Sequence, residues 1–388
     1  MELFKYYTAG QGKATSETCN MLGSEIFPSV HESVEVLYSQ FEANAKKILF
    51  VEDDNTYILP IAGTGSLAME ILLCNIIDKD ETIMLADNGF FAARLSDIAL
   101  RHEANIQKIS KKWGEIISVD DVKKAYAESN AKVLFMIHGE TSTGVLQPIR
   151  EIGEYCKENG ILLLLDCATT IGGAKFKMSE WHVNGMFTIS QKCLATSPGI
   201  SIIAVDKLYI NKMKNITNKK KPFYLDMQLL INQSYNTKSY HHTQPYSLIN
   251  SLNSSMSQIL ERGIENEWLR YKTISNFVSK QLELLGVNLF IQEENCRLPQ
   301  LITCSLPNNQ NIHDFIVSMK RRYHIYLSKG IGMYGSNMIR IGLLGNNSQK
   351  TEVIYLLLCL LSYFSEYNNK IDIKEFLKNI NDFGVENG

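Results

Sequence analysis

The sequence predicts an α/β protein whose larger part is built on a mostly parallel sheet, followed by a smaller α+β region. Short, continuously apolar runs alternate with helical patterns in the first half of the 388-residue chain. Such runs are typical of parallel strands that helices cover on both faces. Polar residues follow directly after several of these runs. Beyond about residue 206 the pattern changes to long helices with a few strands between them.

Several short apolar runs are predicted to be the strands of the larger part. They span residues 58–62, 82–86, 132–137, 161–165, 186–189 and 200–205. Residues 67–77 are apolar nearly all round, as in a buried helix, and residues 149–158 have the pattern of an amphipathic helix that Asn159 and Gly160 end. A strand, a helix and a strand of these lengths form a right-handed crossover between parallel strands.

The second half is expected to be mainly helical. The basic, asparagine-rich segment 211–221 is interpreted as a solvated loop, and residues 246 to about 286 are strongly helical. A domain boundary is placed inside that helical stretch. The expected divisions are an N-terminal arm (1–19), a large α/β domain (20–262) and a small α+β C-terminal domain (263–388). The elements expected in the small domain are strands at 301–306 and 338–343 and a buried helix at 353–364.

The composition excludes several classes of protein. The chain is 45% hydrophobic and 21% charged, as soluble globular proteins are. Its formal net charge of −2 gives no overall field to attract nucleic acid or acidic membranes. The apolar run at 353–364 is too short to span a bilayer, and the N-terminus lacks a secretory signal pattern. The eight cysteines contain no C-x-x-C pair and are expected to be reduced and mostly buried. We therefore expect a cytoplasmic protein with no nucleic-acid or membrane partner.

Polar residues lie at the carboxyl ends of the predicted strands, where open parallel sheets bind ligands. Gly63-Thr64-Gly65-Ser66 offers hydroxyls and backbone N–H groups at a helix N-terminus, which suits a phosphate, although alone it fits a plain tight turn equally well. Phe91, after the next strand, could stack on a flat ring, although a core phenylalanine is more common. Residues 138–144 form a dense polar cluster directly after an apolar run, which favours a site over an ordinary loop.

Two further strand ends carry an acid and an amine. Asp166 follows four leucines, where a carboxylate needs a positive partner unless it caps a helix. Lys192 leaves a buried strand, so desolvation would lower its pKa and free the amine as a nucleophile, although surface lysines are more common. A phosphate cradle, an aromatic plate, a buried carboxylate and a buried amine together indicate a pyridoxal phosphate site. No metal site is expected.

The stretches that carry these features resemble a known family. They are GTGS (63–66), NGFF (88–91) with Arg94, HGETSTGVLQPI (138–149), LLLLDCATTIGGAKFKMSEW (162–181), SQKCLATSPG (190–199), YHHTQP (240–245) and RIGLLG (340–345). In these stretches the chain resembles a class V aminotransferase of fold type I, in the alanine–glyoxylate and serine–pyruvate aminotransferase group. The resemblance covers roughly residues 20–348 and implies the pyridoxal-phosphate-dependent transferase fold, with a mostly parallel seven-stranded sheet in the large domain.

The resemblance implies a role for individual residues. Lys192 matches the Schiff-base lysine, and Asp166 matches the partner of the pyridine nitrogen. The other implied cofactor-binding residues are Thr64, Gly65 and Ser66 on the phosphate-binding turn, Gln191 as a phosphate ligand, Phe91 on the ring face, Ala168 beneath the ring, and Thr141 near the phenolic oxygen. Tyr240 and Thr243 match residues that reach the phosphate of the neighbouring subunit, which implies a homodimer with shared active sites.

The resemblance also implies substrate-binding residues. Arg340 matches the arginine that binds the substrate α-carboxylate, and a guanidinium can pair with a carboxylate bidentately; a structural salt bridge is the alternative. Gly10 lies in the substrate-facing N-terminal segment. That segment, TAGQGK (8–13), lacks the prolines of the family's usual T-P-G-P turn and is expected to be more flexible. One hypothesis is that Lys13 meets a second substrate anion, such as a phosphonate or a distal carboxylate.

The expected reaction moves an amino group from a small amino acid of the alanine or serine type to a small 2-oxo acid, glyoxylate or pyruvate, with ping-pong kinetics. A 2-aminoethylphosphonate–pyruvate aminotransferase is the nearest alternative. A cysteine desulfurase-like lyase would need a mobile nucleophilic cysteine, which neither Cys296 nor Cys304 suits. A non-catalytic protein on the same fold would be expected to have lost Lys192 or Asp166.

Overall fold

A seven-stranded sheet forms the larger part of the molecule. The computed structural model describes residues 4–23, 32–217, 221–236, 239–368 and 370–385. The strands of this sheet, in spatial order, are β2 (Tyr57–Ala62), β10 (Ile200–Val205), β9 (Gly185–Ile189), β8 (Leu162–Asp166), β5 (Val133–Ile137), β3 (Thr82–Asp87) and β4 (Asn105–Ser110). β10 is antiparallel to both of its neighbours, and β9, β8, β5, β3 and β4 are parallel. The prediction of a mostly parallel sheet is therefore confirmed.

The apolar runs predicted as strands all form strands of this sheet, with bounds close to those expected. The sequence did not indicate β4. Its residues, NIQKIS, are mostly polar, and the strand lies at the edge of the sheet with only Ile109 buried. An edge strand exposed on both faces carries no continuous apolar signal.

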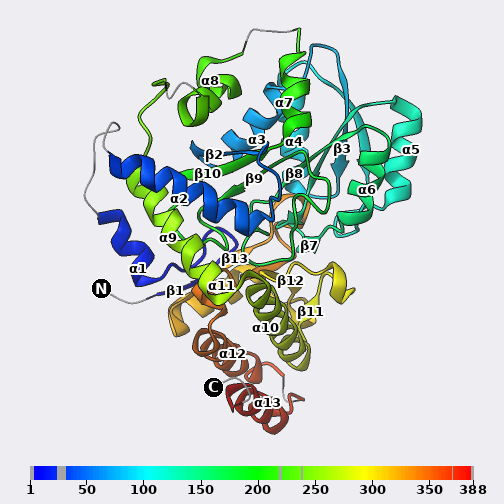
Figure 1. The fold of residues 1–388 in the computed structure, drawn as a ribbon. Coiled ribbons are helices and arrows are strands. Elements are labelled where there is room, and N and C mark those ends of the chain that lie inside the picture. The colour runs from blue at the N-terminus through cyan, green and yellow to red at the C-terminus, as the bar shows by residue number, and fades with distance from the viewer. Residues whose placement is uncertain (1–3, 24–31, 218–220, 237–238, 369, 386–388) are drawn as a thin grey trace.

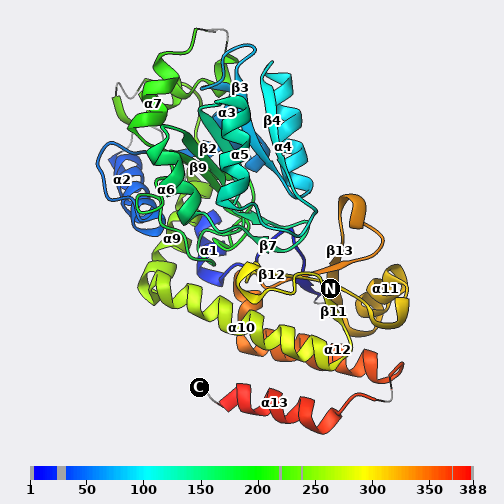
Figure 2. The same cartoon turned by 90° about the vertical axis from the view of Figure 1, so that its right-hand side faces the viewer.

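Helices cover both faces of the large sheet (Figures 1 and 2). One apolar core includes residues of α2 (Glu32–Leu49), α5 (Val119–Ser129), α6 (Arg150–Glu158) and α9 (Tyr246–Arg262). The other includes residues of α3 (Gly65–Cys74), α4 (Phe90–Arg101), α7 (Lys207–Lys214) and α8 (Met227–Ile231). A short helix, α1 (Ser16–Asn20), precedes them. Burial on both faces explains why the central strands are apolar without interruption.

The interpretation of residues 211–221 as a solvated loop is wrong in part, because residues up to Lys214 belong to α7. The carboxylate of Asp206 accepts a hydrogen bond from the backbone N–H of Tyr209 at 2.9 Å and so caps this helix. Tyr209 and Met213, one turn apart, pack into the core, while the lysines and asparagines between them conceal that apolar face in the sequence. Residues 218–220 lie outside the described residues.

The smaller part is built on a second, mixed sheet. Its strands, in spatial order, are β1 (Lys5–Tyr7), β13 (Ile325–Lys329), β14 (Ile339–Gly342), β12 (Leu301–Ser305) and β11 (Asn288–Leu289). Its helices are α10 (Ile264–Leu284), α11 (Ile312–Tyr323), α12 (Lys350–Ser365) and α13 (Ile373–Val385). β1 pairs in parallel with β13, so the N-terminal segment lies beside the C-terminal part of the chain (Figure 2). α12 is the buried helix expected at 353–364, and Gly263 separates α9 from α10 at the proposed domain boundary.

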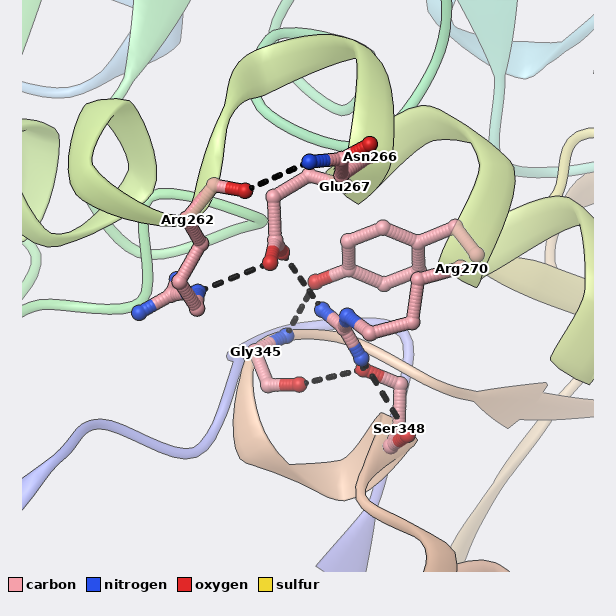
Figure 3. Close-up of polar contacts among 7 residues, drawn as sticks. Arg262, Asn266, Glu267, Arg270, Gly345 and Ser348 are labelled. Carbon is pink, nitrogen blue, oxygen red and sulfur yellow. Dashed lines mark hydrogen bonds and ion pairs between the residues drawn. The ribbon is translucent and has the colours of Figure 1, made fainter. Parts of the chain in front are cut away.

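A polar network joins the start of α10 to the turn that follows β14 (Figure 3). The carboxylate of Glu267, which is only 3% exposed, pairs with Arg262 and Arg270, each at 2.7 Å. Arg270 also donates to the hydroxyl of Ser348 at 2.6 Å, and that hydroxyl donates to the carbonyl of Gly345 at 2.6 Å. A buried carboxylate is tolerated when its partners are this well placed. The network therefore fixes the position of the turn from Gly345 to Ser348.

Within the described ranges, no helix combines the length and the hydropathy that crossing a bilayer requires. The eight cysteines are free, and all of them are buried except Cys19, which is exposed, and Cys296, which is half-buried. This agrees with the expectation of reduced, mostly buried thiols.

Candidate active site

The carboxyl ends of β2, β3, β5, β8 and β9 meet at one edge of the large sheet, as expected for parallel strands and for a β2 that is antiparallel to β10. The loops that follow these strands carry the residues singled out in the sequence. A short ribbon, β6 (Gly139–Glu140) with β7 (Val145–Leu146), closes the loop after β5. The small sheet contributes Arg340 from β14 to the same region.

Lys192 lies in the loop after β9 and is half-buried, and its Nζ donates to the backbone carbonyl of Ala9. Burial, together with the nearby charge of Arg340, lowers the pKa of Lys192 to about 8, although Asp166 opposes the shift. At that pKa about a fifth of the amine is neutral at pH 7.4, far more than for an ordinary lysine, so it can act as a nucleophile or a base. The desolvation that the sequence predicted for this amine is thus consistent with its surroundings.

Asp166 is the last residue of β8 and is 6% exposed. Its Oδ1 accepts a hydrogen bond from the backbone N–H of Ala168 at 2.8 Å. Burial, helped by the negative charge of Glu140, raises the pKa of Asp166 to about 7, although the hydrogen bond from Ala168 and the charges of Lys192 and Arg94 oppose the shift. In the described part of the chain no cationic group lies within ion-pair distance of this carboxyl. A positively charged ligand atom placed there could therefore form an ion pair with this buried carboxyl.

The turn after β2 presents polar groups at the start of α3. Thr64 is the N-cap residue, but its hydroxyl does not cap the helix, and both Thr64 and Ser66 are exposed. The first N–H groups of a helix have no partner within the helix. The guanidinium of Arg94 donates to the hydroxyl of Ser66 at 3.1 Å and lies 5.0 Å from the centre of the Phe91 ring. Hydroxyls, backbone N–H groups and a cation therefore gather where a phosphate group could bind.

Glu140 is a buried acid to which sequence reasoning assigned no role. It is 1% exposed, its Oε1 accepts from the backbone N–H of Ser142 at 2.9 Å, and its Oε2 accepts from that of Phe91 at 3.1 Å. Burial raises the pKa of Glu140, and these hydrogen bonds oppose the shift. The carboxylate thus holds the start of α4, with its aromatic ring, against the loop after β5. The only sequence signal was its place within the polar cluster at 138–144.

Arg340 links the two parts of the molecule. Its Nε donates to the carbonyl of Lys329 at 3.0 Å, and its Nη1 donates to the carbonyl of Thr141 at 3.1 Å. Burial lowers the pKa of Arg340, although a guanidinium remains charged at any physiological pH. These contacts hold the side chain toward the region of Lys192 without a carboxylate partner among the described residues. The alternative of a structural salt bridge for Arg340 is therefore not supported.

Other predicted residues occupy less central positions. The carbonyl of Gln191 accepts from the N–H of Gly12 at 2.7 Å, and Gly10 is exposed. The hydroxyls of Tyr240 and Thr243 lie 2.9 Å apart, and Tyr240 is 73% exposed. Among the described residues, no hydrogen bond or ion pair joins these two to Lys192, Asp166 or the turn after β2. Within one chain, therefore, the structure does not bring them into the site.

Lys13 has a partner within the chain, which bears on the hypothesis of a second substrate anion. Its Nζ pairs with Oε1 of Glu352 on α12 at 2.7 Å. The charge of Lys13 is thus already matched by a carboxylate, which does not favour contact with a substrate anion.

A partly buried lysine and a buried aspartate at adjacent strand ends of this fold are the arrangement expected of an aminotransferase of fold type I. Residues 3–356 match the family Aminotransferase class-V, and the chain belongs to that family. Enzymes of this family use pyridoxal phosphate.

Similar proteins include several alanine–glyoxylate aminotransferases. That of Mus musculus is 33% identical over 77% of this chain and 73% of its own length, and that of Drosophila melanogaster is 27% identical over 96% and 94%. The crystal structure of alanine–glyoxylate aminotransferase from Nostoc sp. superposes with a TM-score of 0.89 at 29% identity, covering 93% of this chain and 96% of that one. Ureidoglycine–glyoxylate aminotransferase from Bacillus subtilis shares the fold, with a TM-score of 0.93 at 22% identity and coverage of 99% and 98%.

Proposed function

We propose that this enzyme transfers the amino group of a small amino acid, of the alanine or serine type, to a small 2-oxo acid such as glyoxylate or pyruvate, using pyridoxal phosphate. The observation that carries the proposal is the desolvated amine of Lys192, with its lowered pKa, close to the buried carboxyl of Asp166, which has no cationic partner among the described residues. The names of the relatives support the choice of substrates. A cytoplasmic location stays a prediction.

The residues present fit pyridoxal phosphate. Asp166 has one N–H donor and no cationic partner among the described residues, so it can hold a protonated pyridine nitrogen. The turn of Thr64, Gly65 and Ser66 and the side chain of Gln191 would hold the phosphate. Phe91 and Ala168 would enclose the two faces of the ring, and Thr141 would lie near the phenolic oxygen. The bound cofactor supplies an electron sink for the charge that develops at the substrate Cα.

The protein's own residues perform the proton transfers. With pyridoxal phosphate bound, the free amine of Lys192 would remove the proton from the substrate Cα as general base and give up a proton as general acid. Asp166 would hold the proton on the pyridine nitrogen of the bound cofactor while charge develops. Arg340 orients the substrate by its α-carboxylate, so that the Cα proton faces the amine. The same groups act in reverse on the acceptor 2-oxo acid.

A panel of donors and acceptors tests the proposed substrates. Purified enzyme with pyridoxal phosphate is assayed with alanine, serine and 2-aminoethylphosphonate against glyoxylate and pyruvate. We expect the highest kcat/KM with an α-amino acid, because the guanidinium of Arg340 would pair with its α-carboxylate. A marked preference for 2-aminoethylphosphonate, which has no carboxylate, would refute the proposed donor and support the alternative. Release of sulfur from cysteine as the main activity would refute amino transfer.

Substitution of Arg340 by glutamine should weaken substrate binding more than chemistry. The variant loses a charge-assisted pairing with the α-carboxylate, for which we expect kcat/KM to fall by about 10- to 100-fold, mainly through KM. Steady-state kinetics with alanine measure this. Arg322→Gln, at an exposed ion pair with Glu366, is the matched control and should retain the kinetics of the original enzyme. An unchanged KM in Arg340→Gln would contradict the assignment.

The lowered pKa of Lys192 predicts how the cofactor-free protein captures pyridoxal phosphate. Only the neutral amine attacks an aldehyde, so the capture rate should rise with pH around a midpoint of about 8. An ordinary lysine would give a midpoint of about 10.4. Stopped-flow absorbance between pH 6 and pH 10 measures the rate, and Lys192→Ala identifies the reacting group. A midpoint near that of an ordinary lysine would contradict the desolvation argument.

We also infer that the enzyme is a homodimer with shared active sites. Tyr240 is 73% exposed although it carries a large aromatic ring, and its hydroxyl is already paired with that of Thr243. Tyr240 also borders a cavity of about 340 Å³ beside α2, with Tyr38 and Tyr235. A surface of this kind is suited to a second copy of the chain, whose phosphate site these two hydroxyls would complete.

A further inference from the structure

Residues 8–13, here called the strap, lie against Lys192 in the candidate active site. The carbonyl of Ala9, within the strap, accepts a hydrogen bond from Nζ of Lys192. The N–H of Ala9 donates to the hydroxyl of Ser328 at 3.1 Å, and the N–H of Gly12 donates to the carbonyl of Gln191 at 2.7 Å. The strap therefore touches both the reactive amine and the residue before it.

Backbone approach at the strap is so close that two positions need glycine. A Cβ atom on Gly12 would lie 2.2 Å from the carbonyl oxygen of Lys192. A Cβ atom on Gly342 would lie 2.0 Å from the carbonyl oxygen of Thr8. Neither neighbour is a flexible side-chain end, so the strap, β14 and the lysine loop are packed backbone to backbone.

Both ends of the strap are tied to one carboxylate, that of Glu352 on α12. Before the strap, Lys5 pairs with Oε2 at 2.7 Å, and the hydroxyl of Tyr7 donates to the Glu352 carbonyl at 2.8 Å and to Oε2 at 3.1 Å. At the other end, Lys13 pairs with Oε1 at 2.7 Å. Burial raises the pKa of Glu352, but the two ammonium groups outweigh it and hold the pKa below its ordinary value. The carboxylate is therefore charged at neutral pH.

The second end of the strap also rests on the turn shown in Figure 3. The N–H of Lys13 donates to the carbonyl of Leu344 at 3.2 Å, and the N–H of Asn346 donates to the carbonyl of Lys13 at 2.8 Å. Arg270 holds this turn through Ser348, as described above. The turn that contacts Lys13 is thus fixed, and Glu352 connects the two ends of the strap through its ion pairs with Lys5 and Lys13.

We infer that Glu352 is a positioning residue for amino transfer: it fixes the strap over Lys192 and thereby sets the substrate-facing wall of the site. The strap contains no proline, and for that reason the sequence predicts a flexible segment. The ion pairs of Glu352 restrain the strap in place of prolines. The predicted effect on KM rests on the proposed function. The predicted effect on the backbone of the strap does not.

Glu352→Gln tests the structural consequence in the cofactor-free protein. Hydrogen–deuterium exchange of the backbone amides of residues 8–13 should become faster, on the order of tenfold, because the ion pairs that hold the segment are lost. Glu366→Gln, at the other end of α12 and also ion-paired, is the matched control and should leave this exchange unchanged. Equal exchange in Glu352→Gln and the original protein would overturn the inference, as would equal acceleration in both variants. This measurement does not depend on amino transfer.

Kinetics of the holoenzyme test the second consequence. KM for the amino donor should rise several-fold in Glu352→Gln and in Lys13→Met, while kcat changes less, because the wall is displaced but the catalytic groups remain. Lys13→Arg keeps the charge and should restore the original KM and exchange rate. Faster exchange with an unchanged KM would overturn the positioning role, and failure of Lys13→Arg to restore KM would do the same. Loss of activity with every donor in the original enzyme would instead refute the proposed function.

Discussion

Replacing Lys192 with alanine should abolish amino transfer. Without the amine there is no general base for the substrate Cα proton and no covalent attachment of the cofactor, so we expect kcat to fall by at least about 10⁴-fold. The visible absorbance of the attached cofactor should also be lost. Borohydride reduction followed by peptide mass analysis should find pyridoxal phosphate on Lys192 in the original enzyme and on no peptide of the variant.

Lys175→Ala is the matched control for this experiment. Lys175 is exposed and belongs to the same stretch that resembles the family, and no hydrogen bond or ion pair among the described residues joins it to the site. Its removal should leave turnover, absorbance and the labelled peptide unchanged. Retention of both turnover and absorbance in Lys192→Ala would refute the assignment of the site, whereas a change in Lys175→Ala would point to a general effect of charge.

The central site could be predicted because its residues follow strong signals. Lys192 and Asp166 come directly after apolar runs that only a buried strand explains, and the ends of parallel strands meet at one edge. Once the runs are placed in a sheet, those two side chains must lie near each other. The same argument placed the turn after β2 and the loop after β5.

The residues that were missed carry no local signal. Glu140 is an acid within a polar loop, and only the fold shows that it is buried and accepts two backbone N–H groups. Glu352 is separated from Lys13 by 339 positions in the chain, and no periodicity relates them. β4 is polar because it lies at a sheet edge. Burial and long-range pairing of charged groups are tertiary properties, and composition or spacing cannot reveal them.

Replacing Asp166 with asparagine should reduce kcat by about 10²- to 10⁴-fold. Asparagine preserves the size of the side chain but cannot pair with a protonated pyridine nitrogen, and breaking a buried ion pair costs about 3–5 kcal/mol. Each 1.36 kcal/mol corresponds to about a tenfold change in rate. Steady-state kinetics at saturating cofactor measure the loss. A kcat within a few-fold of the original enzyme would contradict the proposed role of Asp166.

Stability of the cofactor-free protein gives an independent measurement. Because the pKa of Asp166 is raised to about 7 in the folded chain, its contribution to stability is complete below the unfolded pKa, about 3.9, and is lost as the pH rises through about 7. Asparagine does not titrate, so Asp166→Asn should gain stability relative to the original protein between pH 5 and pH 8. Urea unfolding at both pH values measures that difference.

Asp206→Asn is the matched control for the kinetic experiment. Asp206 caps α7 at the opposite edge of the sheet, so its replacement should leave kcat unchanged. Loss of kcat in Asp166→Asn alone would therefore follow from the site and not from the removal of a strand-end carboxylate.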